Sequence, residues 1–198
     1  SKTVVTDAPN MTVLLVAAGW MFAHTLAWGL LGRFLALMLQ TRGFLSPLNA
    51  HLRVFFYLAL GVSGHLFVLF IAGATGFFDP IWVSLTLVPL SVIGFKGVWA
   101  SLRFRAFSQV ALALFALGYV LQFAIRAPGY WDDTSFHLPI ARFYLEQGHF
   151  AVAEFLRFPL CPQHMNLLIA QGLSLQGELL AQMLATWPLW LMLLGLYG

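Results

Sequence analysis

The sequence predicts an all-α integral membrane protein with about five transmembrane helices. Apolar residues make up 61% of the 198-residue chain and charged residues only 9%, whereas an ordinary soluble domain carries about 25% charged residues. Five separate stretches are apolar over the length that a helix needs to cross a bilayer, about 20 residues. A soluble fold of this size cannot bury so much apolar surface, so we expect lipid to surround the helices.

The few charges exclude other classes of protein. The net charge is only +3, and the Lys and Arg residues are scattered along the chain, whereas a nucleic-acid-binding protein needs a basic patch. We therefore expect no nucleic-acid partner. A single cysteine, Cys161, excludes an internal disulfide and a cysteine-based metal site, and the sequence predicts no other metal site.

The apolar stretches predict a single transmembrane domain over residues 1–198. The spans are expected at residues 11–31, 54–74, 81–100, 107–125 and 178–197, and the first continues as an interfacial turn over 33–39. Pro89 lies inside the third span and should kink it, because a proline removes one backbone hydrogen bond. Residues 126–177, between the fourth and fifth spans, form an extramembrane segment.

The positive residues predict the orientation of the spans. Six of them fall in two alternate connections between spans: Arg33, Arg42, Arg53, Lys96, Arg103 and Arg105. The short turn between the second and third spans holds only Asp79. Since Lys and Arg accumulate on the cytoplasmic side, both basic connections are expected inside. The N-terminus and residues 126–177 are then outside.

The outer segment is expected to form short helices at the membrane surface. Asp133 or Thr134 can cap a helix over residues 136–146, and Gly148 stands where that helix would stop. One face of it carries apolar residues, and another carries Arg142 and Glu146, as in an amphipathic surface helix. The apolar residues are Ile140, Phe143, Tyr144 and Leu145. A second helix is expected after Pro162, including Leu167, Leu168 and Ile169.

The strongest candidate site lies just before that first surface helix. Asp132 and Asp133 are adjacent carboxylates beside the imidazole of His137, and such a set can take the proton of a hydroxyl nucleophile. Neighbouring residues of an extended chain point to opposite sides, so one carboxylate is expected to face a substrate. The alternative is structural, because an Asp-Asp-Thr-Ser run is also a good turn and helix cap.

The motif of residues 130–139, followed by residues 141–148, resembles multispanning bacterial glycosyltransferases of the GT-C type. Relatives of that type often carry a loop of the form D-x-x-x-Y-H-L-P before a surface helix that ends in glycine, and the later Gly177-Glu178 before a span is similar too. They are usually longer, so the chain corresponds to an N-terminal part or a shortened relative. The resemblance implies a bacterial inner-membrane enzyme that transfers a sugar from a polyprenyl-phosphate carrier at the outer face.

The resemblance also implies roles for particular residues. Asp133 or Asp132 acts as base or orients the acceptor, with His137 beside it. Phosphate contacts fall on three arginines of the outer segment, since a guanidinium matches the geometry of a phosphate. These are Arg126, Arg142 and Arg157. A divalent metal stays open as a cofactor.

Two histidines inside predicted spans suggest a different function. His24 lies in the first span, and His65 lies in the second, one helical turn after Gly61. Ionisable residues inside a membrane are functional candidates by default, and a neutral imidazole can ligate haem or chlorophyll. The alternative is that each histidine hydrogen-bonds a neighbouring helix.

The sequence therefore predicts a lipid-linked sugar transferase, or else a non-catalytic subunit of a larger membrane complex built on a GT-C-like fold. In the second case the partners are other transmembrane subunits, and a pigment or haem is bound through His65 or His24.

Overall fold

The computed structural model describes residues 11–45, 50–85, 118, 136–152 and 164–197. Within these ranges every regular element is a helix: α1 (Met11–Thr41), α2 (Ala50–Thr75), α3 (Pro80–Leu85), α6 (Leu138–Gln147), α7 (His164–Leu175) and α8 (Glu178–Tyr197). The all-helical prediction is thus confirmed for this part of the chain. The fourth predicted span, apart from Gly118, lies outside the described residues, as do Pro89 and the rest of the third span beyond α3.

Two of the described helices are long and apolar enough to cross a membrane, namely α1 and residues Phe55–Thr75 of α2. α1 has 31 residues and is therefore about 46 Å long, more than the hydrocarbon thickness of about 30 Å. It continues through residues 33–39 as regular helix, where the sequence predicted a separate interfacial turn. The reason is local, because this stretch has no proline or glycine to break the helix and Gly43, at φ 75°, follows its end.

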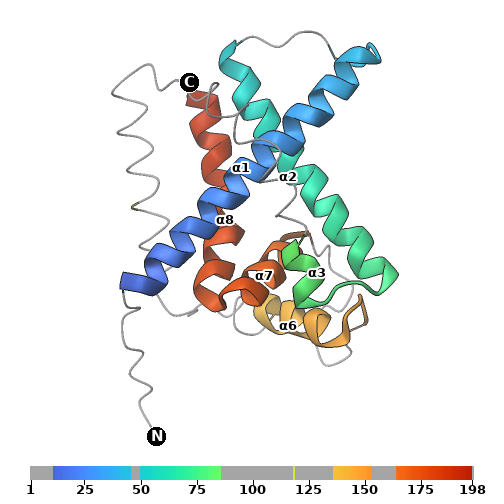
Figure 1. The fold of residues 1–198 in the computed structure, drawn as a ribbon, viewed down its shortest axis with the longest axis vertical. Coiled ribbons are helices and arrows are strands. Elements are labelled where there is room, and N and C mark those ends of the chain that lie inside the picture. Colours follow the sequence, from blue (N-terminus) through green and yellow to red (C-terminus); the bar gives the residue numbers. More distant parts are fainter. Residues whose placement is uncertain (1–10, 46–49, 86–117, 119–135, 153–163, 198) are drawn as a thin grey trace, which may run out of the picture.

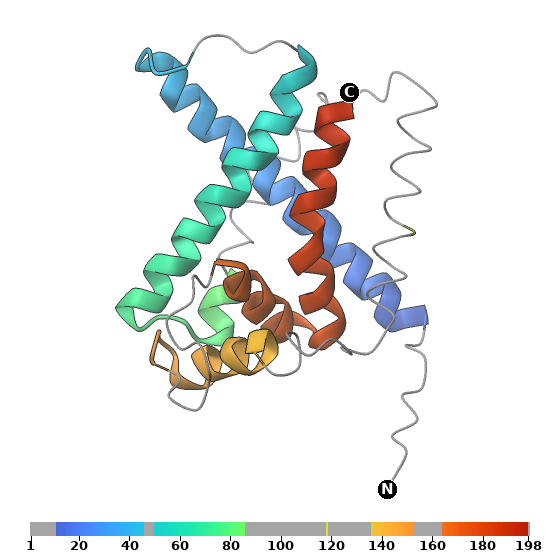
Figure 2. The same ribbon diagram turned by 180° about the vertical axis from the view of Figure 1, so that it is seen from behind.

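The two long helices cross with their backbones in contact (Figures 1 and 2). A Cβ atom added to Gly32 would lie 1.6 Å from the carbonyl oxygen of Tyr57, and one added to Gly61 would lie 1.8 Å from that of Trp28. Only glycine therefore fits at these two positions. Close approach at small residues is the usual way in which helices associate in lipid.

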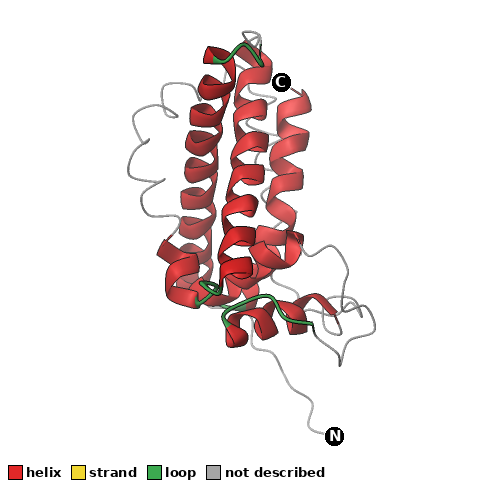
Figure 3. Cartoon of the chain, turned by 90° about the vertical axis from the view of Figure 1, so that its right-hand side faces the viewer, coloured by secondary structure: helices red, strands yellow, loops and turns green. Residues whose placement is uncertain are grey.

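Helices α3, α6 and α7 gather at one end of the long helices, and α8 runs from that end alongside them (Figures 1 and 3). α7 and α8 form a tight hairpin that turns at Gly177, where φ is 103°, and Gly172 lies against the backbone of Ala181. The carboxylate of Asp79 caps α3 by accepting from the backbone N–H groups of Ile81 and Trp82 at 2.8 and 3.1 Å. This end of the bundle holds α6, the predicted surface helix.

Candidate functional site

Helix α6 is amphipathic, as the sequence predicted, and it begins two residues and ends one residue after the predicted helix over residues 136–146. It runs from Leu138 to Gln147 with Pro139 in its first turn, and Gly148 ends it in the left-handed conformation at φ 70°. Ile140 and Tyr144 are buried and Arg142 is exposed. The prediction of an amphipathic helix that ends at Gly148 is therefore confirmed, and its position at a membrane surface stays a prediction. The prediction of a second helix containing Leu167, Leu168 and Ile169 is also confirmed, because these residues lie in α7.

Backbone hydrogen bonds fix α6 to the end of α2. The N–H of Phe150 donates to the carbonyl oxygen of Gly73 at 3.0 Å, and the N–H of Phe78 donates to that of Gly148 at 2.8 Å. The ring of Phe150 occupies the space beside Gly73 that a side chain would fill, and it also packs on the ring of Tyr144 at a centroid distance of 5.0 Å. The residues on α6 are thus held at a defined place relative to the long helices.

His137 lies immediately before α6 and is held by α7. Its Nδ1 donates to the side-chain oxygen of Asn166 at 2.7 Å, and the ring of Phe136 packs edge-on against it at 5.0 Å. Asn166 is itself buried, with 2% of its surface exposed. The orientation of the imidazole is therefore set by a residue 29 positions away in the sequence.

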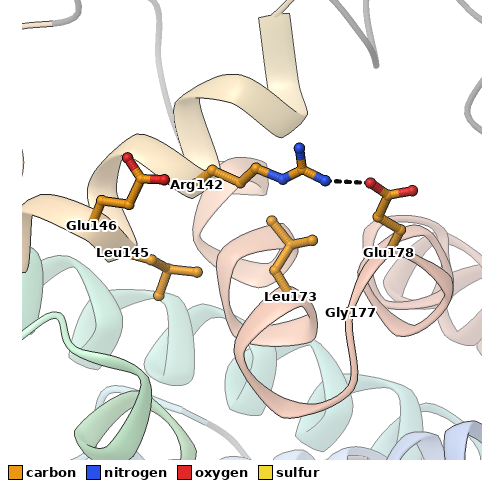
Figure 4. Close-up of a pocket in the computed structure, with 6 residues that line it drawn as sticks. All are labelled: Arg142, Leu145, Glu146, Leu173, Gly177 and Glu178. Carbon is orange, nitrogen blue, oxygen red and sulfur yellow. Dashed lines mark hydrogen bonds and ion pairs between the residues drawn. The ribbon is translucent and has the colours of Figure 1, made fainter.

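Arg142 reaches from α6 to the start of α8, where its guanidinium pairs with the carboxylate of Glu178 (Figure 4). Both side chains are about half exposed, at 54% and 45%. The pair borders a pocket of about 360 Å³, which Leu145, Glu146 and Leu173 also line. The pocket therefore combines a cation, two carboxylates and an apolar wall.

The histidines predicted inside spans meet in the core of the bundle. The Trp28 indole N–H donates to Nδ1 of His65 at 2.8 Å, and Nδ1 of His24 donates to the carbonyl oxygen of Trp20 at 2.7 Å. Nε2 of His24 lies 3.3 Å from the amide oxygen of Gln171. Nε2 of His65 lies 3.4 Å from the amide nitrogen of Gln171. We call His24, Trp28, His65 and Gln171 the core polar cluster.

The core polar cluster joins four helices. The Gln171 amide also donates to the carbonyl oxygen of Val83 at 3.0 Å, so α1, α2, α3 and α7 all contribute to it. His24, Trp28, His65 and Gln171 are each at most 1% exposed. These polar groups therefore lie within hydrogen-bonding distance of one another, as buried polar groups in an apolar bundle require.

A macrocycle at His65 would need space that the structure gives to other groups. The backbone of Trp28 fills the space beside Gly61, one turn before His65. The Trp28 indole N–H occupies Nδ1 of His65. The histidines thus have partners on neighbouring helices, as the structural alternative stated.

The remaining predicted site residues lie outside the described residues. These are Asp132, Asp133, Arg126 and Arg157. Among the described residues, the structure brings together no group of three or more His, Cys, Asp or Glu side chains that could hold a metal ion.

Comparison with known proteins identifies a relative. An uncharacterized protein of Shigella flexneri is 36% identical to the chain over 144 residues, which cover 69% of this chain and 72% of that protein. The chain belongs to the same family as that protein. No protein-family model matches the chain, and no solved structure does.

Three polar residues that the structure places in the core polar cluster or beside His137 were not predicted from the sequence. The sequence analysis assigned no role to Trp28, Asn166 or Gln171. The available signal was the presence of two amides in the otherwise apolar α7. A buried amide must find partners, so these residues had to face other polar groups.

Proposed function

We propose that the chain is a membrane glycosyltransferase-like protein that moves a sugar from a polyprenyl-phosphate donor to an acceptor hydroxyl at the outer face of the membrane. The observation that carries the proposal is the position of His137 and Arg142 at the start of α6 and within it, at one end of the apolar bundle. An imidazole and a guanidinium at the same end of the bundle suit a donor whose lipid chain is in the bilayer and whose phosphate is at its surface.

The proposal includes a multi-pass topology with five spans in a bacterial inner membrane and the N-terminus outside. The two long apolar helices support the membrane setting, the bacterial relative supports the source, and the distribution of Lys and Arg supports the orientation. Single cysteines placed at Ser101 and at Ser135, in a Cys161→Ser background, should react with an impermeant reagent from opposite sides. Reaction of both from one side would disprove this topology.

Asp133 and Asp132 act on the acceptor in this proposal, one of them as base or as orienting group, and Arg142 contacts the carrier phosphate together with Arg126 and Arg157. The test is transfer from a labelled polyprenyl-phosphate sugar by the full chain in proteoliposomes. We expect Asp133→Asn to lower the rate by about 10²–10⁴-fold, as loss of a group that deprotonates or orients the acceptor does, and Asp132→Asn to have a small effect.

Asp79→Asn is the matched control, because Asp79 caps α3 and asparagine caps a helix about as well as aspartate, so this variant should change stability and activity little. Parental rates for both Asp132→Asn and Asp133→Asn, with the fold intact, would mean that the acidic pair is structural.

A second candidate is a non-catalytic transmembrane subunit of a larger complex built on a GT-C-like fold. The observation that favours it is the ion pair, because a guanidinium already held by Glu178 serves a structural role equally well. Absence of transfer by the unmodified chain with polyprenyl-phosphate donors, together with its co-purification with other membrane subunits, would favour this candidate.

A further inference from the structure

The bond between His137 and Asn166 determines which nitrogen of the imidazole carries the proton. The acceptor in this bond is the side-chain oxygen of Asn166, 2.7 Å from Nδ1 of His137. An amide oxygen can only accept, so Nδ1 must carry a hydrogen. In the neutral ring the lone pair that can take a proton is then on Nε2.

The surroundings of Asn166 hold this arrangement in place. Asn166 lies in the first turn of α7 and is 2% exposed, between the buried cores of α6 and α7. With the side-chain oxygen of Asn166 facing Nδ1, only the tautomer with a hydrogen on Nδ1 makes this hydrogen bond. On its other side the His137 ring meets the edge of the Phe136 ring. The contacts with Asn166 and Phe136 therefore hold the His137 ring in place.

His137 is only half-buried, so it is accessible to a substrate while its Nδ1 is engaged. This arrangement matches the general form of an activated base, in which a third group orients the imidazole. An amide, unlike a carboxylate, orients the ring without adding a negative charge.

We propose that Asn166 is a positioning residue that holds His137 in its Nδ1–H tautomer, so that Nε2 takes the proton of the acceptor hydroxyl during sugar transfer. This inference rests on the proposed function. The acceptor oxygen forms a bond to the anomeric carbon of the sugar, the bond from that carbon to the phosphate oxygen breaks, and its electron pair leaves with the polyprenyl phosphate. The imidazolium then returns its proton to water. The carboxylate of Asp133 or Asp132 is left to orient the acceptor.

The tautomer is tested without any activity measurement. The full chain labelled with ¹⁵N-histidine in detergent micelles, above the pH at which imidazoles are protonated, should show His137 with a hydrogen on Nδ1 and none on Nε2. The signal is assigned by its loss in His137→Gln. Asn166→Leu should return the ring to the Nε2–H form that free histidine prefers. An Nε2–H tautomer in the unmodified chain would overturn the proposal.

The catalytic part is tested by the dependence of the transfer rate on pH. Asn166→Asp places a carboxylate on Nδ1, which should move the acid limb of the profile to higher pH by about one unit or more. Asn166→Leu should lower kcat by about 10-fold or more with little change in the KM for the donor. Asn166→Ser, which keeps an acceptor in a smaller side chain, should retain more activity than Asn166→Leu.

Ser174→Asp is the control, since it adds the same charge to α7 two turns beyond Asn166 and should leave the acid limb in place. If the unmodified chain transfers sugar and Asn166→Asp keeps the parental profile, the positioning role is wrong while the proposed function stands. If the unmodified chain transfers nothing, the proposed function fails and the catalytic role of His137 fails with it. The tautomer experiment then decides the structural part alone.

Discussion

The indole N–H of Trp28 donates a 2.8 Å hydrogen bond to Nδ1 of His65. Trp28 also places its backbone against Gly61, one helical turn before that histidine. One residue of α1 thus provides both the close backbone contact and the polar contact that join it to α2. The two contacts can be removed separately, so each gives its own prediction.

Trp28→Phe should destabilise the protein by about 1–3 kcal/mol. The change keeps most of the ring but removes the donor, and it leaves the buried Nδ1 of His65 without this partner. The measurement is the free energy of unfolding in mild detergent. Trp82→Phe is the matched control, because Trp82 is 55% exposed and its replacement should change stability little. Equal effects of the two replacements would contradict the role of the hydrogen bond.

Gly61→Ala should disrupt the crossing of α1 and α2. The added methyl group would lie 1.8 Å from the backbone oxygen of Trp28, so the helices must separate, and we expect a loss of about 3 kcal/mol or more. Gly19→Ala, where nothing lies within 4 Å of the added atom, should be neutral or stabilising by up to about 1 kcal/mol, since alanine favours a helix. A Gly61→Ala protein as stable as Gly19→Ala would show that the helices do not touch there.

These features mark the limit of what the sequence could predict. Helix α6 was predictable because its signals are local: an apolar face of helical period and Gly148 at its end. The core polar cluster was not, because it depends on where α1 crosses α2 and on a third helix that arrives 106 residues after His65 with Gln171. Gly61 illustrates the difficulty, since a glycine before a histidine suits a bound ring and a close helix contact equally well. Only the path of α1 decides between these two uses.

The candidate site was likewise predictable only in part. His137 and Arg142 follow from the local motif, but their partners, Asn166 and Glu178, lie 29 and 36 residues away. No period in the sequence links these positions. The packing of α6 against α7 and the tight turn at Gly177 bring them together.

Tyr144 should make stability depend on pH in alkaline solution. It is 5% exposed on the buried face of α6, and this burial raises the pKa of its phenol above the ordinary value, because the phenolate is poorly solvated there. A group whose pKa is higher in the folded state stabilises the fold fully below its unfolded pKa, about 10. That contribution is lost as the pH rises through the folded pKa.

Tyr144→Phe should therefore reduce the loss of unfolding free energy between about pH 9 and about pH 11. The measurement is a series of denaturation curves in detergent across that interval. Tyr57→Phe, which removes a phenol from a half-buried position in α2, controls for the general effect of removing a hydroxyl. A Tyr144→Phe protein that loses stability as steeply as the unmodified chain would contradict this assignment.

Variants of the Arg142–Glu178 ion pair can distinguish a structural role of Arg142 from a phosphate-binding role. Both side chains are about half exposed, and exposed ion pairs contribute only about 0–1 kcal/mol. Arg142→Gln and Glu178→Gln should each change the free energy of unfolding by less than about 1 kcal/mol. The two variants should therefore lose stability alike, and a difference between their transfer kinetics must come from ligand binding.

If Arg142 contacts the carrier phosphate, the two variants should differ in donor binding. Arg142→Gln loses a charge-assisted hydrogen bond, typically about 1.5–3 kcal/mol, so the KM for the polyprenyl-phosphate donor should rise by about 10-fold or more. Glu178→Gln releases the guanidinium from its present partner and removes a carboxylate that repels phosphate, so it should lower that KM. The measurement is the initial rate of transfer as donor concentration is varied. An equal rise of KM in both variants would mean that Arg142 serves the fold through Glu178, and the carrier phosphate would then have to be bound elsewhere in the outer segment.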